Sequence, residues 1–299
     1  MKKTRMIAVV LAIAMLLGAL TGCSLFKPTA MSLSKKTIEN FAKVKSFQSN
    51  IKAEYAGAAT ISGMDVDLVM NADCDLDAVI SSGVSRADGT VSTTLPLIGN
   101  VSIPFESYQQ TGNDGVTAYT KIHNSQWIKT ESKAQEEENP DRKFDIRIVL
   151  GVLQKISSGD IKAELAEETE MMGDREVYRM DVSISGELLG ELIKAAAESE
   201  GEQSGIPENL DLTGADAEFV FYIFKDTSLP ARIFCDCTEL GNIMVQQAGT
   251  EEFSARADKF QITMQFNEYD TIDEIKIPDE VTREAVESED LNIMDLIGA

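Results

Sequence analysis

The residue with the clearest chemistry in this chain is Cys23. It follows Leu20-Thr21-Gly22, and an aliphatic residue, two small residues and a cysteine form the pattern that lipoprotein-processing enzymes read. Residues 1–5 are cationic and residues 6–20 carry no charge, as in a signal peptide that is too short to span a bilayer. We expect residues 1–22 to be a lipoprotein signal peptide. Acylation of Cys23 would then anchor the chain at the outer face of the cytoplasmic membrane.

Three further cysteines remain: Cys74, Cys235 and Cys237. An odd number permits one disulfide at most, and Cys74 with Cys235 or Cys237 is the long-range option. Buried free thiols are the alternative. Cys235-Asp236-Cys237 has the appearance of half a metal site, but no second cysteine pair or histidine cluster completes it, so we expect no metal.

Asp73, Asp75 and Asp77 alternate along the chain, and an extended strand would place them on one face. Carboxylate oxygens suit calcium. The EF-hand spacing fails, however, because the sixth position is Ala78 and the twelfth is Val84. These carboxylates are therefore predicted to lie on a solvated strand edge, whose charge also discourages edge-to-edge pairing.

His123 is the only histidine, and it lies in a predicted turn, His123-Asn124-Ser125. A catalytic triad of the Ser-His-Asp or Cys-His type would need this residue. Neither the Gly-x-Gly-x-x-Gly nor the Walker phosphate-binding pattern occurs. The sequence therefore predicts a protein that is not an enzyme and has no cofactor.

The overall charge is strongly negative, at −23, and removal of residues 1–22 takes away three basic residues and leaves −26. Such a surface repels nucleic acid, so we expect no nucleic-acid partner. The hydrophobic content of 43% is compatible with a folded core rather than disorder.

Runs rich in strand-forming residues, separated by turn residues at intervals of roughly ten, predict an antiparallel meander over residues 47–130. Apolar stripes at helical spacing predict three helices, at residues 34–46, 144–157 and 186–199. Further strands are predicted at 161–171, 177–184, 215–225, 229–240 and 260–269. The whole reads as one α+β unit.

Several segments resemble one family of envelope proteins. They are the processing site at Cys23, the helix-to-strand junction Val44–Phe47, Tyr119–Lys129, Phe221–Pro230 and the closing segment Tyr269–Val281. Together they resemble the LppX/LprG/LolA-like lipoproteins of Gram-positive bacteria. The resemblance implies a curved antiparallel sheet, an incomplete β-barrel, packed over a few α-helices.

We expect this domain at residues 35–282, between a lipidated tether at 23–34, which is rich in small polar residues, and an acidic C-terminal tail at 283–299. The resemblance also implies a pocket between sheet and helices. The candidate lining residues are Ile148, Val152, Leu153, Ile156, Leu188, Leu189, Leu192 and Ile193. The expected function is binding or transfer of an acyl-chain ligand without catalysis. The alternative is a structural or protein-interaction lipoprotein with a filled core, no ligand and an unidentified protein partner.

Overall fold

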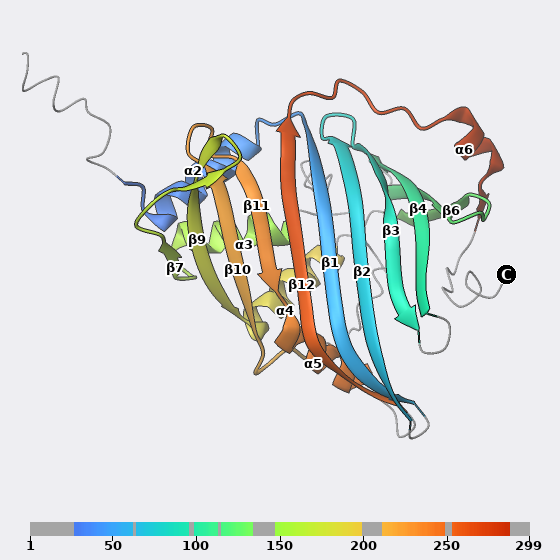
Figure 1. The fold of residues 1–299 in the computed structure, drawn as a ribbon. Coiled ribbons are helices and arrows are strands. Elements are labelled where there is room, and N and C mark those ends of the chain that lie inside the picture. The colour runs from blue at the N-terminus through green and yellow to red at the C-terminus, as the bar shows by residue number, and fades with distance from the viewer. Residues whose placement is uncertain are drawn as a thin grey trace, which may run out of the picture.

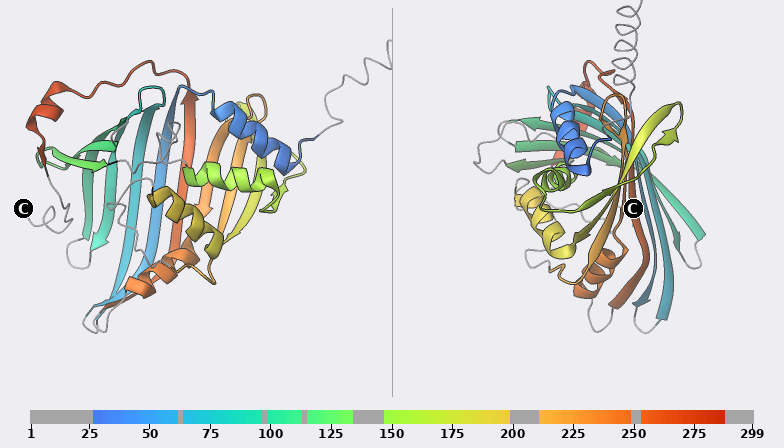
Figure 2. Two further views of the ribbon diagram at one scale, coloured as in Figure 1. Left: turned by 180° about the vertical axis from the view of Figure 1, so that it is seen from behind. Right: turned by 90° about the vertical axis from the view of Figure 1, so that its left-hand side faces the viewer.

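The computed structural model describes residues 27–61, 64–95, 99–112, 115–133, 147–198, 211–248 and 253–287. Cys23 and the predicted leader lie outside these residues, as do the end of the acidic tail and residues 144–146 of the second predicted helix. A large open sheet curves around a layer of helices (Figure 1), and the helices α2–α5 lie on one side of it (Figure 2). The predicted fold class, a curved antiparallel sheet packed over a few helices, is confirmed.

The helices of the described residues are α2 (Ala30–Phe41), α3 (Arg147–Ser158), α4 (Gly186–Glu198), α5 (Thr238–Ala248) and α6 (Asp279–Glu284). The strands are β1 (Ser46–Ile61), β2 (Met64–Val79), β3 (Val84–Leu95), β4 (Gly99–Gly112), β5 (Gly115–Ile122), β6 (Ile128–Lys133), β7 (Ala163–Leu165), β8 (Glu170–Met172), β9 (Arg175–Ser185), β10 (Asp216–Phe224), β11 (Pro230–Asp236), β12 (Phe253–Tyr269) and β13 (Val286–Glu287).

Among the described residues the strands form one sheet in the order β13-β6-β5-β4-β3-β2-β1-β12-β11-β10-β9-β7, with β8 paired to β9. Neighbours are antiparallel except for β13, which runs parallel to β6. Strand β1 pairs with β2 on one side and with β12 on the other. This long-range pairing joins the N-terminal meander to the C-terminal strands.

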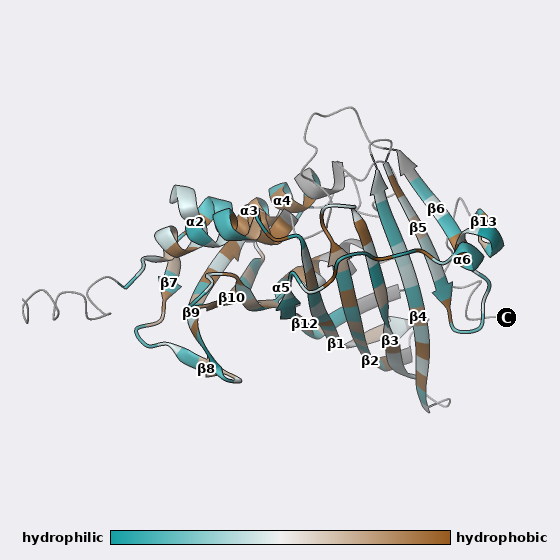
Figure 3. Ribbon diagram, turned by 90° about the horizontal axis from the view of Figure 1, so that it is seen from above, coloured by the Kyte–Doolittle hydropathy of each residue, from teal (hydrophilic) through white to brown (hydrophobic). Residues whose placement is uncertain are grey.

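Alternation along the strands gives the sheet an inner face, toward the helices, and an outer face. On β1 the inner residues Phe47 and Ser49 are buried, whereas Gln48 and Asn50, which alternate with them, are only partly buried. The strand pairing places inner residues of neighbouring strands next to one another, since Ile51 lies opposite Cys74 on β2 and opposite Met264 on β12. Teal and brown accordingly alternate along these strands in Figure 3.

The main core lies between the inner face and the helices. Phe47 is completely buried, and its ring centroid is 5.6 Å from that of Phe266 on β12 and 6.0 Å from that of Phe41 on α2. Val152 and Leu153 of α3 are also completely buried in this core. Burial of each such side chain stabilises the fold by about 1.5–3 kcal/mol.

Two glycines lie where neighbouring strands approach closely on the inner face. A Cβ atom at Gly57 would lie 2.1 Å from the carbonyl oxygen of Arg256 on β12, next to an irregularity in the β1–β12 register. A Cβ atom at Gly89 would lie 2.3 Å from the carbonyl oxygen of Asp73 on β2. Glycine in a strand marks such close backbone approaches, which let a sheet bend.

The boundaries of the first helix were predicted wrongly. Helix α2 begins at Ala30 rather than Ser34, because Thr29 is its N-cap. Thr29 Oγ1 accepts the Ser32 N–H at 3.1 Å, and Ser32 Oγ accepts the Thr29 N–H at 2.9 Å. This reciprocal capping box satisfies two N–H groups at the helix start.

The predicted strand 229–240 is also corrected, because it ends at Asp236 and helix α5 follows from Thr238. Asp236 Oδ1 accepts the Thr238 N–H at 3.0 Å and the Thr238 hydroxyl at 2.6 Å. The side chain of Asp236 therefore satisfies the first donors of the helix, as a capping residue does. The predicted strand 161–171 consists of two short strands, β7 and β8.

The end of the described chain forms a strap that passes from β12 to the far edge of the sheet (Figure 1). Val281 of α6 is 2% exposed and packs with Tyr108 and Trp127 in a second core. The Val286 N–H then donates to the Trp127 carbonyl oxygen at 3.0 Å, where β13 pairs with β6. Residues 286 and 287 thus contact the edge strand of the sheet.

A disulfide between Cys74 and Cys235 is excluded by the sheet order. Cys74 on β2 and Cys235 on β11 have β1 and β12 between them, so three strand spacings separate the two residues by about 14 Å. A disulfide requires Cα atoms within about 7 Å of each other. Cys74, Cys235 and Cys237 are all free in the structure.

Candidate functional site

Among the described residues, the inner face of the central strands carries no charged side chain. In the described parts of β1–β5, every residue that the ladders place on this face is neutral, and most are apolar. The partner face of β12 continues it with Phe260, Ile262 and Met264. The chain has 50 acidic and 27 basic residues, so the exclusion of charged side chains from this face leaves it available for apolar contacts.

The apolar face extends beyond the main core. The core reaches Leu76 on β2 and Met264 on β12, which pack against it while partly buried. Past these residues, Ala72 on β2, Val91 on β3 and Ile103 on β4 continue the apolar face and are also only partly buried. From Leu76 to Val66 the face is about 33 Å long, and from β1 to β5 it is about 19 Å wide.

Helices α3 and α4 lie side by side across the helix-covered part of this face (Figure 2). A Cβ atom at Gly151 of α3 would lie 2.9 Å from Cδ2 of Leu192 on α4, so the two helices pack closely. The eight candidate lining residues divide into two groups. Val152, Leu153, Ile156 and Leu189 are buried in the main core, whereas Ile148, Leu188, Leu192 and Ile193 are partly exposed at its margin.

Cys74 lies on the inner face in the middle of β2 and is partly buried. Burial, and to a smaller extent the nearby Asp88, Asp75 and Asp73 carboxylates, together raise the pKa of its thiol to about 11. The thiol is therefore neutral at pH 7. A neutral Cys74 keeps this face free of charge and behaves as a small apolar side chain.

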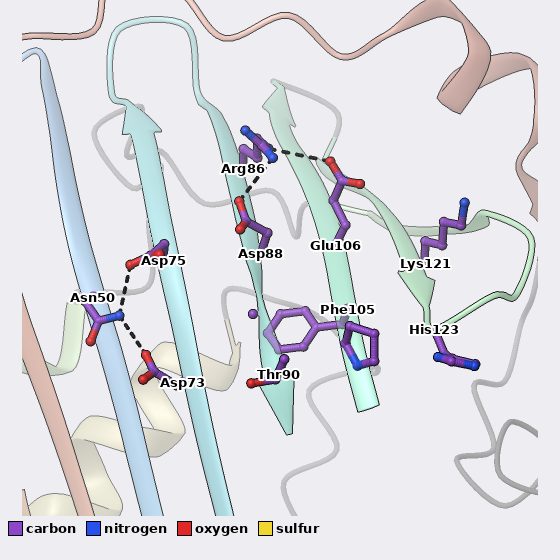
Figure 4. Close-up of a pocket in the computed structure, with 12 residues that line it drawn as sticks. Asn50, Asp73, Asp75, Arg86, Asp88, Thr90, Phe105, Glu106, Lys121 and His123 are labelled. Carbon is purple, nitrogen blue, oxygen red and sulfur yellow. Dashed lines mark hydrogen bonds and ion pairs between the residues drawn. The ribbon is translucent and has the colours of Figure 1, made fainter. Parts of the chain in front are cut away.

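The outer face of the same strands is polar and includes a shallow groove of about 720 Å³ (Figure 4). The Asn50 amide donates to Asp73 Oδ1 at 2.7 Å and to Asp75 Oδ1 at 2.9 Å. The hydrogen bond from Asn50 lowers the pKa of Asp73, and Lys52 assists from 3.2 Å. These carboxylates thus interact with side chains of the neighbouring strand on the solvated outer face. The prediction of a strand edge is wrong, because β2 pairs with both β1 and β3.

A second cross-strand cluster lies beside the first in Figure 4. Arg86 is 3.2 Å from Asp88 and 3.6 Å from Glu106. His123 is exposed in the turn after β5, with φ = 53°, and its ring lies 3.0 Å from the Asn124 amide. In the part of the chain that the structure describes, no three metal-ligating side chains gather into a site.

No described helix is both long and apolar enough to cross a membrane. A family model described as a family of unknown function, DUF6612, matches residues 29–286. The chain belongs to the DUF6612 family. A comparison of this DUF6612 chain with curated proteins finds no match.

Solved structures that are similar to the DUF6612 chain include the following three. The lipoprotein LppX of Mycobacterium tuberculosis is 11% identical with a TM-score of 0.42, and the match covers 84% of this chain and all of LppX. A β-barrel-like DUF1849 protein of Brucella abortus is 9% identical with a TM-score of 0.27, over 75% of this chain and 99% of that one. A LolA-superfamily protein of Nitrosomonas europaea is 12% identical with a TM-score of 0.21, over 85% and 97%.

The predicted lining residues lie on helices α3 and α4 of the DUF6612 domain, whereas the uncharged face lies mainly on the strands. The sequence contained a signal for this uncharged face. Asp73, Asp75 and Asp77 occupy alternate positions, and the residues between them, Cys74 and Leu76, must point to the opposite face. The same alternation in β1, β3 and β4 completes the inner face.

Proposed function

We propose that this DUF6612 protein is a membrane-anchored extracytoplasmic lipoprotein that binds or transfers a hydrophobic, acyl-chain ligand without catalysis. The observation that carries the proposal is the uncharged inner face of β1–β5, which continues beyond the packed core. Apolar surface left in contact with water costs about 25 cal/mol per Å². A ligand that covers part of this face would therefore gain binding free energy without any specific polar contact.

The character of the face suits a flexible chain rather than a rigid polar molecule. Met70 is 43% exposed, and Met264 lies at the edge of the core. Methionine side chains adapt to irregular apolar partners. Ala53 and Ala72, paired across β1 and β2, are small residues that project little from the sheet. Alkyl chains match this combination of length, width and absence of charge.

The proposed anchor is the acylated Cys23 at the outer face of the cytoplasmic membrane of a Gram-positive bacterium. Because α2 begins at Ala30, the segment between anchor and domain is only a few residues long. The Cys23→Ala variant is expected to remain unprocessed or to leave the membrane fraction, and to incorporate no radioactive palmitate. Labelling of that variant would refute the anchor.

A structural or protein-interaction role in the envelope is the second candidate. It is favoured by the burial of Val152, Leu153, Ile156 and Leu189, which fill the space between α3, α4 and the sheet. Under this proposal the inner face would meet a protein partner and take up no lipid.

A pair of lysine substitutions tests the ligand directly. Ala72 lies on the inner face of β2 and is partly buried, and Asn71 beside it is exposed on the outer face. Ala72→Lys places a charge where the ligand would lie, and we expect it to weaken binding of a fluorescent long-chain fatty acid about tenfold or more. Asn71→Lys adds the same charge on the opposite face and should leave binding unchanged. Equal affinity of the two variants would contradict binding at the inner face.

Native mass spectrometry with solvent extraction, on the full chain purified from its own host's envelope, would identify the cargo. A co-purifying lipid supports the carrier proposal. Protein that carries no lipid and takes up no fluorescent fatty acid favours the structural role.

A further inference from the structure

Two cysteine thiols meet where β11 ends and α5 begins. The Sγ atoms of Cys235 and Cys237 lie 2.9 Å apart, although no bond joins them. Cys235 is 6% exposed on the inner face, and Cys237 packs against the main core while remaining partly exposed. This pair is independent of the apolar face of β1–β5.

The end of the strand explains the short distance. Residues two apart in a regular strand share a face at a Cα separation of about 6.6 Å, inside the range of about 4.4–6.8 Å that a disulfide spans. At Cys237 the chain leaves the strand. The Cys237 N–H donates to the Phe260 carbonyl oxygen at 2.8 Å, and the Cys237 carbonyl accepts the Gly241 N–H at 2.8 Å. The backbone is held on both sides while the two side chains lean toward each other.

We infer that Cys235 and Cys237 form a reversible disulfide, with a small disulfide of the glutathione class as oxidant. The Cys237 thiolate attacks one sulfur of the oxidant and releases one thiolate, which leaves a mixed disulfide on Cys237. The Cys235 thiol then loses its proton and attacks Cys237 Sγ, and the second oxidant thiolate leaves. The two cysteines lose two protons and two electrons, and the oxidant becomes two thiols.

The roles of the two thiols follow from their surroundings. The hydrogen bond from Cys235 lowers the pKa of Cys237, and the same contact, together with burial, raises the pKa of Cys235. Cys237 is also the more exposed of the two. An external disulfide therefore meets Cys237 first, and Cys235 is positioned to resolve the mixed disulfide.

Closure would fix the start of α5 against the sheet. Asn242 of α5 already bridges to β12, since its amide donates to the Ala257 carbonyl oxygen at 2.7 Å and its Oδ1 accepts the Ala257 N–H at 2.8 Å. The disulfide adds a covalent link between β11 and Cys237, the residue that precedes α5. The helix would then be held to two neighbouring strands at the margin of the inner face.

Peptide mapping of the full chain tests the inference. Trypsin cleaves after Arg232 and Arg256 and releases both cysteines on one peptide, 233–256, whereas Cys74 lies on another. The chain is reduced, freed of reductant, treated with excess oxidised glutathione, denatured and labelled with N-ethylmaleimide. We expect peptide 233–256 to be unlabelled and about 2 Da lighter than the dithiol. After reduction it should carry two labels.

Two labels, glutathione adducts or links to a second chain on peptide 233–256 after oxidation would overturn the inference. Cys74 serves as the internal control, because it should be open to labelling or to a glutathione adduct but never joined to this peptide. Hydrogen exchange gives a second readout. Amides of α5 should exchange more slowly in oxidised than in reduced protein, and the Cys237→Ser variant should show no such difference. The assay needs no lipid and no membrane, so its outcome is separate from that of the proposed function. The extracytoplasmic location proposed above would supply the oxidising conditions for the disulfide.

Discussion

The curvature that creates the inner face should depend on Gly57. A Cβ atom at this position would lie 2.1 Å from the Arg256 carbonyl oxygen and 2.8 Å from the Tyr55 hydroxyl oxygen. Ordinary carbon contacts begin near 3.4 Å, so the Gly57→Ala variant must move β1 and β12 apart by roughly 1 Å at this point. Because the obstacle is backbone, rotation of a side chain cannot relieve it.

The loss of folding stability in the Gly57→Ala variant has two parts. Overpacking of this kind typically costs about 1–3 kcal/mol. Separation of the strands would also weaken one or two ladder hydrogen bonds, each of which contributes about 0.5–1.5 kcal/mol. We expect Gly57→Ala to lower the free energy of unfolding by about 2–5 kcal/mol. For a domain of this size each kcal/mol shifts Tm by about 2–4 °C.

Differential scanning calorimetry on the wild type, Gly57→Ala and Gly112→Ala measures this effect. Gly112 is the matched control, because a Cβ atom there would meet only the Gly115 carbonyl oxygen, at 3.9 Å. Gly112→Ala should therefore leave Tm within about 2 °C of the wild type. Equal Tm values for the two variants would refute the assignment of Gly57 as the residue that permits the close strand approach.

Two further variants test the strap and the start of α5. Val281→Asp places a charge against Tyr108 and Trp127 and should release the strap. Fluorescence of the single tryptophan should then shift to the red, while the main unfolding transition stays near its original temperature. An unchanged spectrum would contradict this. Burial raises the pKa of Asp236, but hydrogen bonds from Thr238 and Gln261 outweigh it and hold the pKa below its usual value. Its contribution to stability is therefore full above about pH 4 and is lost as the pH falls through the folded-state pKa, so the difference in stability between the wild type and Asp236→Asn should shrink over that range. A difference that stays constant from pH 7 to pH 2 would contradict this.

The sequence by itself determined features that depend on local geometry. Alternation along a strand is imposed by the pleated backbone, so the positions of Asp73, Asp75 and Asp77 predicted that these carboxylates share one solvated face before any pairing was known. Helix α4 was predicted nearly at its observed limits, Gly186–Glu198, because its apolar stripe has the helical period. The antiparallel meander over the first strands followed from turn residues at regular spacing.

Only the tertiary structure decided which segments meet across long distances. The pairing of Phe47 with Tyr269 joins strands more than 200 residues apart, and no local pattern encodes that choice. The same pairing places two strands between Cys74 and Cys235 and so removes a disulfide that the sequence allowed. The start of α5 at Thr238 depends on its packing against β12 as well as on its capping by Asp236. Local periodicity is set by the backbone of each segment, whereas strand order is set by how all segments together bury their apolar faces.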